Sequence, residues 1–161
     1  MATDPRRNKR IAGAAALATA IAVPAEGLRQ VAYFDPPGIL TVCRGHTGAD
    51  VQAGRRYTLA ECDALLTADM RKAVEQVERC APNLPEPVLA AFSDAAFNLG
   101  PTIVCSLEQS TAARLLHAGD IAGACAQLSR WDRARVGGLL VPLPGLAKRR
   151  AAERALCESA L

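Results

Sequence analysis

The sequence lacks the signatures of several common functional classes. None of its six cysteines forms a C-x-x-C pair, which argues against a zinc knuckle or a thioredoxin-type redox site. Neither of its two histidines, His46 and His117, lies in an acidic cluster, so we expect no catalytic metal and no cofactor. The formal net charge of +3 is mild and gives no indication of a nucleic-acid partner. Repeats and long linkers are missing, and 161 residues fit one domain.

The cysteines themselves are numerous for a chain of this size. They are Cys43, Cys62, Cys80, Cys105, Cys125 and Cys157. An even number without metal-ligand spacing favours disulfides and an oxidising compartment such as the periplasm; buried free thiols are the alternative. The count alone leaves many pairings open. Among them we expect Cys43–Cys62, Cys80–Cys105 and Cys125–Cys157, which join neighbouring cysteines and close loops of moderate length.

Apolar periodicity and turn residues predict a mostly helical α+β chain with one small β-hairpin. The hairpin covers residues 31–47, with its turn at Pro36-Pro37-Gly38. Thr58 and Glu61 form a capping box, which opens a long helix that reaches about residue 80. Further helices are expected over residues 8–23, 87–98, 110–116, 120–129 and 146–156.

Two segments interrupt this helical pattern. Pro24 has no N–H to donate, so we expect it to kink or restart the first helix just before Glu26. Residues 133–145 contain Gly137-Gly138 and several prolines, which predicts a loop.

Two carboxyl groups and a hydroxyl lie together between Glu26 and Thr41. Glu26 precedes the expected hairpin, and Asp35 lies at its turn. Breaking a glycosidic bond needs one carboxyl that stays protonated, to donate to the leaving oxygen. It also needs one that stays ionised, to support positive charge at the sugar and to orient a water. A buried position beside a helix end suits the first, and a polar turn suits the second.

An ordered set of short motifs surrounds these residues and covers most of the chain. The set comprises Glu26-Gly27, Tyr33, Asp35, Gly38, Thr41, Gly45-His46-Thr47-Gly48, Phe97-Asn98-Leu99-Gly100, Arg130-Trp131, Gly145-Leu146, Arg149-Arg150 and Glu153. It resembles the signature of the phage lysozymes, glycoside hydrolase family 24. The resemblance implies a two-lobed lysozyme-like fold in which Glu26 is the general acid, Asp35 the second carboxylate and Thr41 the holder of the attacking water. It also implies an inverting course.

His46 follows a glycine after the hairpin, and we interpret it as a structural histidine rather than a catalytic base. The resemblance places Asp69, on the long helix, as its partner.

Three further residues are candidates for substrate binding. Asn98 follows the apolar helix and suits either an N-acetyl group or helix C-capping. Trp131 suits sugar stacking, although a lone tryptophan after a helix is more typical of a core. The resemblance allows Arg149 a place near the far end of the cleft. A solvated ion-paired face, shared with Arg150 and Glu153, explains Arg149 equally well.

The N-terminus carries a separate feature. A basic cluster from Arg6 to Arg10 precedes residues 11–25, which hold no charge and are rich in alanine. As a helix this uncharged segment spans about 22 Å, against roughly 30 Å of hydrocarbon core, and alanine adds little insertion energy. We therefore divide the chain into residues 1–25, a basic N-terminus with a weakly apolar export or anchor segment, and residues 26–161, the catalytic domain.

Three interpretations of residues 11–25 stay open. The small residues of Val23-Pro24-Ala25 suit a cleaved signal peptide, but cleavage there would leave Glu26 as the first residue. The helix propensity of alanine suits a helix of a soluble protein. The chain also resembles phage endolysins of the signal-arrest-release type, which implies a releasable anchor in the host inner membrane and an active form in the periplasm. We favour the releasable anchor, with cleavage second.

The resemblance implies a monomeric muramidase that acts on peptidoglycan and lyses the host cell. Two alternatives stay open. A lytic transglycosylase needs one acid but no water held by Asp35 and Thr41. A non-catalytic wall-binding domain would need none of these groups, so the presence of all three argues against it.

Overall fold

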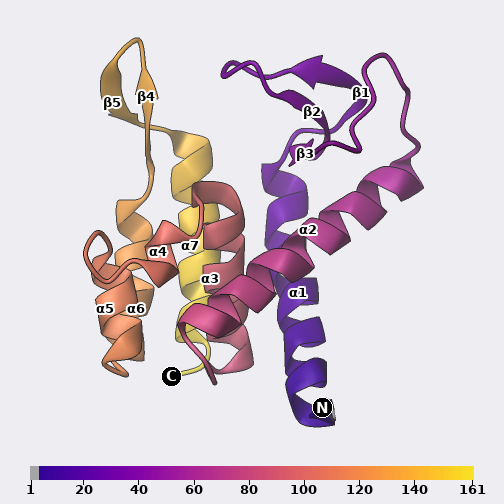
Figure 1. Cartoon of the computed structure of the whole chain (residues 1–161). Coiled ribbons are helices and arrows are strands. Elements are labelled where there is room, and N and C mark those ends of the chain that lie inside the picture. The colour runs from indigo at the N-terminus through magenta and orange to yellow at the C-terminus, as the bar shows by residue number, and fades with distance from the viewer. Residues whose placement is uncertain (1–3) are drawn as a thin grey trace.

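The first helix, α1 (Pro5–Ala25), packs along the helical part of the molecule (Figure 1). The computed structural model describes residues 4–161, so the first three residues of the expected N-terminal segment lie outside it. Asp4 caps α1 by accepting a hydrogen bond of 3.0 Å from the N–H of Arg6. One stripe of α1 is buried, and it consists of Ile11, Ala14, Ala18 and Ala22. This stripe belongs to the main hydrophobic core, so α1 is part of the folded body.

The expected restart of the helix at Pro24 is wrong. The helix continues through Pro24 and ends at Ala25, with Glu26 as its C-cap. Because Pro24 is exposed and lies in the last turn, its missing N–H removes only one helical hydrogen bond. Within residues 4–161, no helix combines the length and the apolar character that a membrane crossing requires.

The predicted hairpin is confirmed, and a short third strand extends it. Strands β1 (Arg29–Phe34), β2 (Leu40–Cys43) and β3 (His46–Thr47) form an antiparallel sheet in that order. Tyr33 pairs with Thr41, which fixes the register around the turn. A separate small core, Val42, Cys43, Val51, Tyr57 and Cys62, lies in this lobe.

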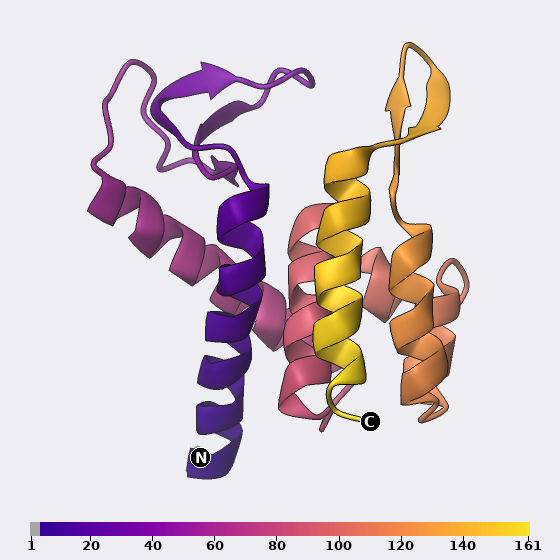
Figure 2. The same ribbon diagram turned by 180° about the vertical axis from the view of Figure 1, so that it is seen from behind.

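Helix α2 (Leu59–Cys80) runs from the sheet to the helical lobe (Figures 1 and 2). Its predicted capping box is confirmed. The N–H of Glu61 donates to the Thr58 hydroxyl over 3.1 Å, and the N–H of Thr58 donates to the Glu61 carboxylate over 2.7 Å. The local sequence therefore sets the start of the helix that joins the two lobes.

The helical lobe surrounds α3 (Glu86–Leu99), whose residues from Val88 to Ala96 are all buried, as its apolar sequence predicts. The other helices are α4 (Thr102–Cys105), α5 (Thr111–His117), α6 (Ile121–Gln127), a 3-10 turn (Leu128–Arg130) and α7 (Pro144–Glu158). Helix α7 packs against α3 and also contacts α1. Mostly helix with small antiparallel sheets confirms the α+β fold.

The loop expected over residues 133–145 is wrong. Strands β4 (Arg133–Val136) and β5 (Leu139–Pro142) form a second hairpin that projects beyond the helices (Figure 1). Its two turn residues, Gly137 and Gly138, have φ of 57° and 83°. This is the left-handed backbone that a tight hairpin turn needs and that glycine adopts without strain.

All three expected disulfides are confirmed, so the free-thiol alternative is wrong. Cys43–Cys62 ties β2 to α2, Cys80–Cys105 ties α2 to α4, and Cys125–Cys157 ties α6 to α7. In the chain-entropy model each closed loop is worth about 3 kcal/mol.

Candidate active site

Glu26 lies at the end of α1, between the helix and the sheet. Its N–H donates to the carbonyl of Ala22 over 2.9 Å, which anchors the backbone. Its side chain is 23% exposed, and Oε1 accepts a hydrogen bond of 2.5 Å from Nη1 of Arg149. Gly45 lies beside the second oxygen, because a Cβ at Gly45 would be 4.0 Å from Oε2. One oxygen of Glu26 is therefore fixed by Arg149, while Oε2 lies on the side of Gly45.

Arg149 comes from α7 and is almost fully buried. Its Nε and Nη2 donate to the two carboxylate oxygens of Asp94, on α3, over 2.9 and 2.8 Å. Burial alone would lower the pKa of Arg149, but the hydrogen bonds and charges of Asp94 and then of Glu26 raise the pKa overall. Arg149 is thus a fixed positive charge between two acids.

The neighbouring pair Arg150 and Glu153 continues this buried network. Arg150 donates to Glu153 over 2.5 Å and to Oδ1 of Asn98 over 3.1 Å. Burial, and then a hydrogen bond to Asp94, raise the pKa of Glu153 to about 9. Both side chains are buried, so the expectation of a solvated ion-paired face is wrong.

Asp35 and Thr41 lie together at the end of the β1–β2 hairpin. Oδ1 of Asp35 accepts a hydrogen bond of 2.8 Å from the N–H of Ile39, which holds the carboxylate in the turn. The hydroxyl of Thr41 is 3.4 Å from Oδ2 of Asp35 and 3.0 Å from the carbonyl of Ile39. Thr41 is buried, so its hydroxyl has a fixed position beside the carboxylate.

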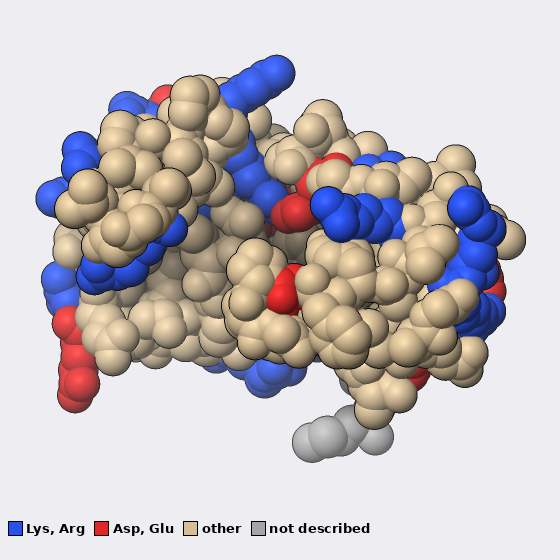
Figure 3. Space-filling view, turned by 90° about the horizontal axis from the view of Figure 1, so that it is seen from above, with Lys and Arg blue, Asp and Glu red and all other residues tan. Residues whose placement is uncertain are grey.

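A cavity of about 650 Å³ lies between the end of α1 and the start of α7. Glu26, Asn98 and Arg149 all line it. Seen from above, the molecule is hollowed between the β1–β3 sheet and the β4–β5 hairpin, and charged side chains lie at the walls of the hollow (Figure 3). The structure thus brings Asn98 and Arg149 to the same cavity as Glu26.

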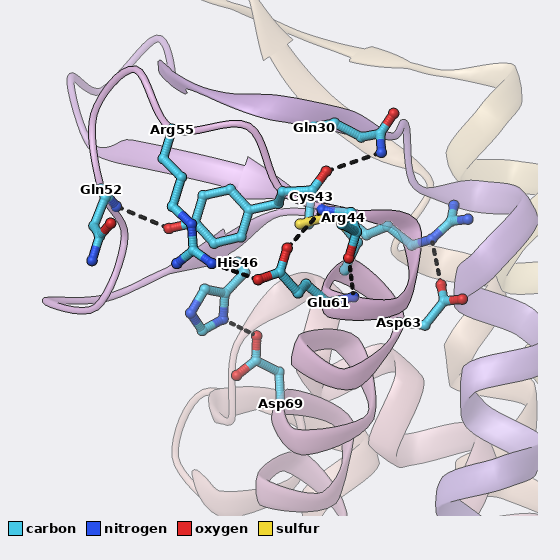
Figure 4. Close-up of a disulfide and its surroundings, with 12 residues drawn as sticks. Gln30, Cys43, Arg44, His46, Gln52, Arg55, Glu61, Asp63 and Asp69 are labelled. Atoms are coloured by element: carbon cyan, nitrogen blue, oxygen red, sulfur yellow. Dashed lines mark hydrogen bonds and ion pairs between the residues drawn. A yellow bond between two sulfur atoms is a disulfide. The ribbon is translucent and has the colours of Figure 1, made fainter.

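His46 contacts Asp69, the partner expected from the sequence (Figure 4). Its Nδ1 lies 2.6 Å from Oδ2 of Asp69, and its Nε2 lies 3.1 Å from Oδ2 of Asp50. Burial lowers the pKa of His46, but the hydrogen bonds and charges of Asp69 and Asp50 raise it overall. His46 therefore ties the sheet to α2.

The remaining candidates have mainly structural surroundings. Trp131 is half-buried and packs against the main core. The C-cap of α3 is Gly100, so the side chain of Asn98 does not cap this helix; it accepts from Arg150 instead. Arg149 is buried in its ion pairs.

Sequence reasoning missed Asp94 and Arg44. Nη1 of Arg44 donates to the carbonyl of Val23 over 3.1 Å, which holds the end of α1. Asp94 is fully buried within a helix that is otherwise strongly apolar. An acid in the middle of such a helix is the available signal, because buried acids are rarely unpaired.

Comparison with known proteins shows that the chain is similar to lytic enzymes of phages. The family model described as "Phage lysozyme" matches residues 24–153. The SAR-endolysin of Bacteriophage PS119 is 41% identical over 133 residues, covering 82% of this chain and 75% of the relative. The SAR-endolysin of Bacteriophage PS34 is 40% identical over 133 residues, with the same two coverages of 82% and 75%.

Solved structures give the same result. The muramidase domain of SpmX from Asticaccaulis excentricus has a TM-score of 0.74 and 30% identity, covering 89% of this chain and 92% of that domain. The endolysin from Escherichia coli O157:H7 phage FAHEc1 has a TM-score of 0.71 and 26% identity, covering 93% of this chain and 92% of that protein.

Proposed function

The chain belongs to the phage lysozyme family, and we infer that it is an endolysin, a glycoside hydrolase that lyses the host cell. Its substrate is the β-1,4 bond between N-acetylmuramic acid and N-acetylglucosamine in peptidoglycan. One observation supports this inference most: the chain has a carboxyl at a helix end, Glu26, and a turn carboxylate, Asp35, that lies 3.4 Å from the hydroxyl of Thr41.

In the proposed mechanism, Glu26 donates a proton from Oε2 to the leaving glycosidic oxygen. Arg149 holds Oε1, so the carboxyl keeps one orientation, with Oε2 toward Gly45. Asp35 and Thr41 together hold the water that attacks the sugar. The Asp35 carboxylate supports the positive charge that develops there and accepts the proton that this water loses as its oxygen bonds to the sugar carbon.

Replacing Glu26 by glutamine tests this role. The amide keeps the shape of the side chain and a partner for Arg149, but it has no acidic proton to donate. We expect lysis of permeabilised Gram-negative cells to fall by about 10²–10⁴-fold, with the fold intact. Glu108→Gln, on the exposed surface, is the matched control and should keep full activity. Near wild-type lysis by a folded Glu26→Gln protein would refute the assignment.

For residues 11–25 we propose that they first hold the protein in the host inner membrane, uncleaved, and later leave it to join the folded enzyme as α1. The names of the relatives support this, since several are SAR-endolysins. The structure adds that the buried stripe of α1 is mostly alanine, so the segment combines a packed face with marginal insertion energy.

In this account the protein is inactive while it is anchored, because α1, which carries Glu26 at its end, is then in the membrane. The released protein is active in the periplasm. N-terminal sequencing of the periplasmic protein tests the absence of cleavage. A sequence that begins at Glu26 would identify an ordinary signal peptide instead.

A further inference from the structure

Asp94 contacts Nε and Nη2 of Arg149, the part of the guanidinium that does not contact Glu26. It is fully buried on α3, and both of its oxygens are occupied by Arg149. The same guanidinium uses its third nitrogen, Nη1, for Glu26. Every guanidinium nitrogen of Arg149 therefore has a carboxylate partner, and the two hydrogen bonds to Asp94 fix the rotation of the guanidinium.

The contact between Arg149 and Glu26 creates an electrostatic conflict. A general acid must keep its proton until the leaving oxygen takes it. A guanidinium within hydrogen-bonding distance instead favours the ionised carboxylate. A negative charge on the far side of the same guanidinium reduces that influence, because it offsets the positive charge that the acid experiences.

The structure assigns to Asp94 the role of a positioning residue for Glu26: it orients Arg149 toward Oε1 and offsets the charge of Arg149, so that Oε2 keeps its proton. This inference rests on the proposed role of Glu26 as the general acid. Asp94 acts through Arg149, and we assign it no contact with substrate.

The other charged groups around Arg149 and Glu26 do not supply this compensation. Glu153, on α7, lies 3.8 Å from Nε of Arg149 and is paired more closely with Arg150, over 2.5 Å. Burial raises the pKa of Glu153, which disfavours its charged form. Arg150 and Lys148 on α7 are positive, and Arg44 gives its hydrogen bonds to backbone carbonyls near Glu26. Asp94 is thus the acid that accepts hydrogen bonds from Arg149 with both of its oxygens, on the side away from Glu26.

The test is the initial rate of wall hydrolysis as a function of pH, with purified peptidoglycan at constant ionic strength. Asp94→Asn keeps the shape of the side chain and removes its charge. We expect the alkaline limb of the profile to move to lower pH by about one unit. Arg149→Gln removes the opposing charge and should move the same limb to higher pH.

Glu153→Gln is the matched control, because it replaces a neighbouring buried acid that lies 3.8 Å from Arg149, against 2.8 Å for Asp94, and whose pKa burial raises. It should leave the limb where the wild type has it. A rate that falls equally at every pH in Asp94→Asn, with no movement of the limb, would show a merely structural role and overturn the inference. Equal movement in Glu153→Gln would overturn it as well.

If Asp94→Asn does not fold, Arg149→Gln tests the inference instead. An alkaline limb that does not move to higher pH in Arg149→Gln contradicts the inference. The proposed function fails separately, through lysis that survives Glu26→Gln. The two failures are therefore distinguishable.

Discussion

At the residue scale, two carboxyl groups receive different surroundings from the same short segment of chain. Glu26 lies at a helix end against a buried guanidinium, and only one of its oxygens is held. Asp35 lies in a turn, where a backbone N–H holds one oxygen and the Thr41 hydroxyl approaches the other. Different environments are how one fold gives two acids different roles.

His46 gives a pH-dependent prediction at the same scale. Its pKa is raised in the folded protein, so the stabilisation from its charged pair is present in full below about pH 6.5. This stabilisation is lost as the pH rises through the raised pKa. We expect Asp69→Asn to lower the free energy of unfolding by about 1.5–3 kcal/mol at pH 5, and by less at pH 9.

Urea unfolding at the two pH values measures this difference. Asp63→Asn is the control, because Asp63 is exposed and its closest charged partner, Arg44, is 4.0 Å away. An equal loss of stability at pH 5 and pH 9 in Asp69→Asn would contradict the charged pair.

At the element scale, α1 has a buried face and an open face, and the two can be varied independently. Ala12 and Ala16 are exposed, so leucine at both positions raises the membrane affinity without touching the core. Gly13 is a poorer choice, since a Cβ there would lie 2.6 Å from the Glu86 carboxyl group. We expect Ala12→Leu with Ala16→Leu to retain the protein in the membrane fraction and to delay lysis.

Serine at the same two positions is the matched control, and should release the protein at least as fast as the wild type. The purified leucine variant should keep its activity on peptidoglycan, which separates retention from damage to the enzyme. Unchanged fractionation and timing of lysis in the leucine variant would contradict the releasable anchor.

The elements also show how far the sequence alone leads. The capping box at Thr58 and the apolar run of α3 are local signals, and both predictions are confirmed. The β4–β5 hairpin is not predicted because its strands are short and its glycines and prolines favour a loop, although Gly137-Gly138 is a typical hairpin turn.

The candidate site also has one part that the sequence predicts and another part that it does not. Glu26, Asp35 and Thr41 are close in sequence, so their motif could be recognised. The contacts of Asp94 with Arg149 could not be predicted, because they join α3 to α7 and depend on how those helices pack.

At the scale of the whole molecule, the site depends on both lobes. The sheet supplies Asp35 and Thr41, while the helices supply Glu26 and Arg149. Helix α2 connects the lobes, and Cys43–Cys62 fixes its start to β2 (Figure 4). The other two disulfides lie in the helical part, so each lobe contains a covalent cross-link. The packing of α1 and α2 sets the position of one lobe relative to the other.

The identity of the ends that the enzyme creates in purified peptidoglycan tests the central claim most directly. Hydrolysis adds the elements of water across the bond, so we predict muropeptides with reducing N-acetylmuramic acid ends in mass spectra of the wild-type digest. Glu26→Gln should give none above background. Anhydro sugar ends, lighter by one water, would identify a lytic transglycosylase, and a digest with no new ends would identify a non-catalytic wall-binding protein; either result would contradict the account.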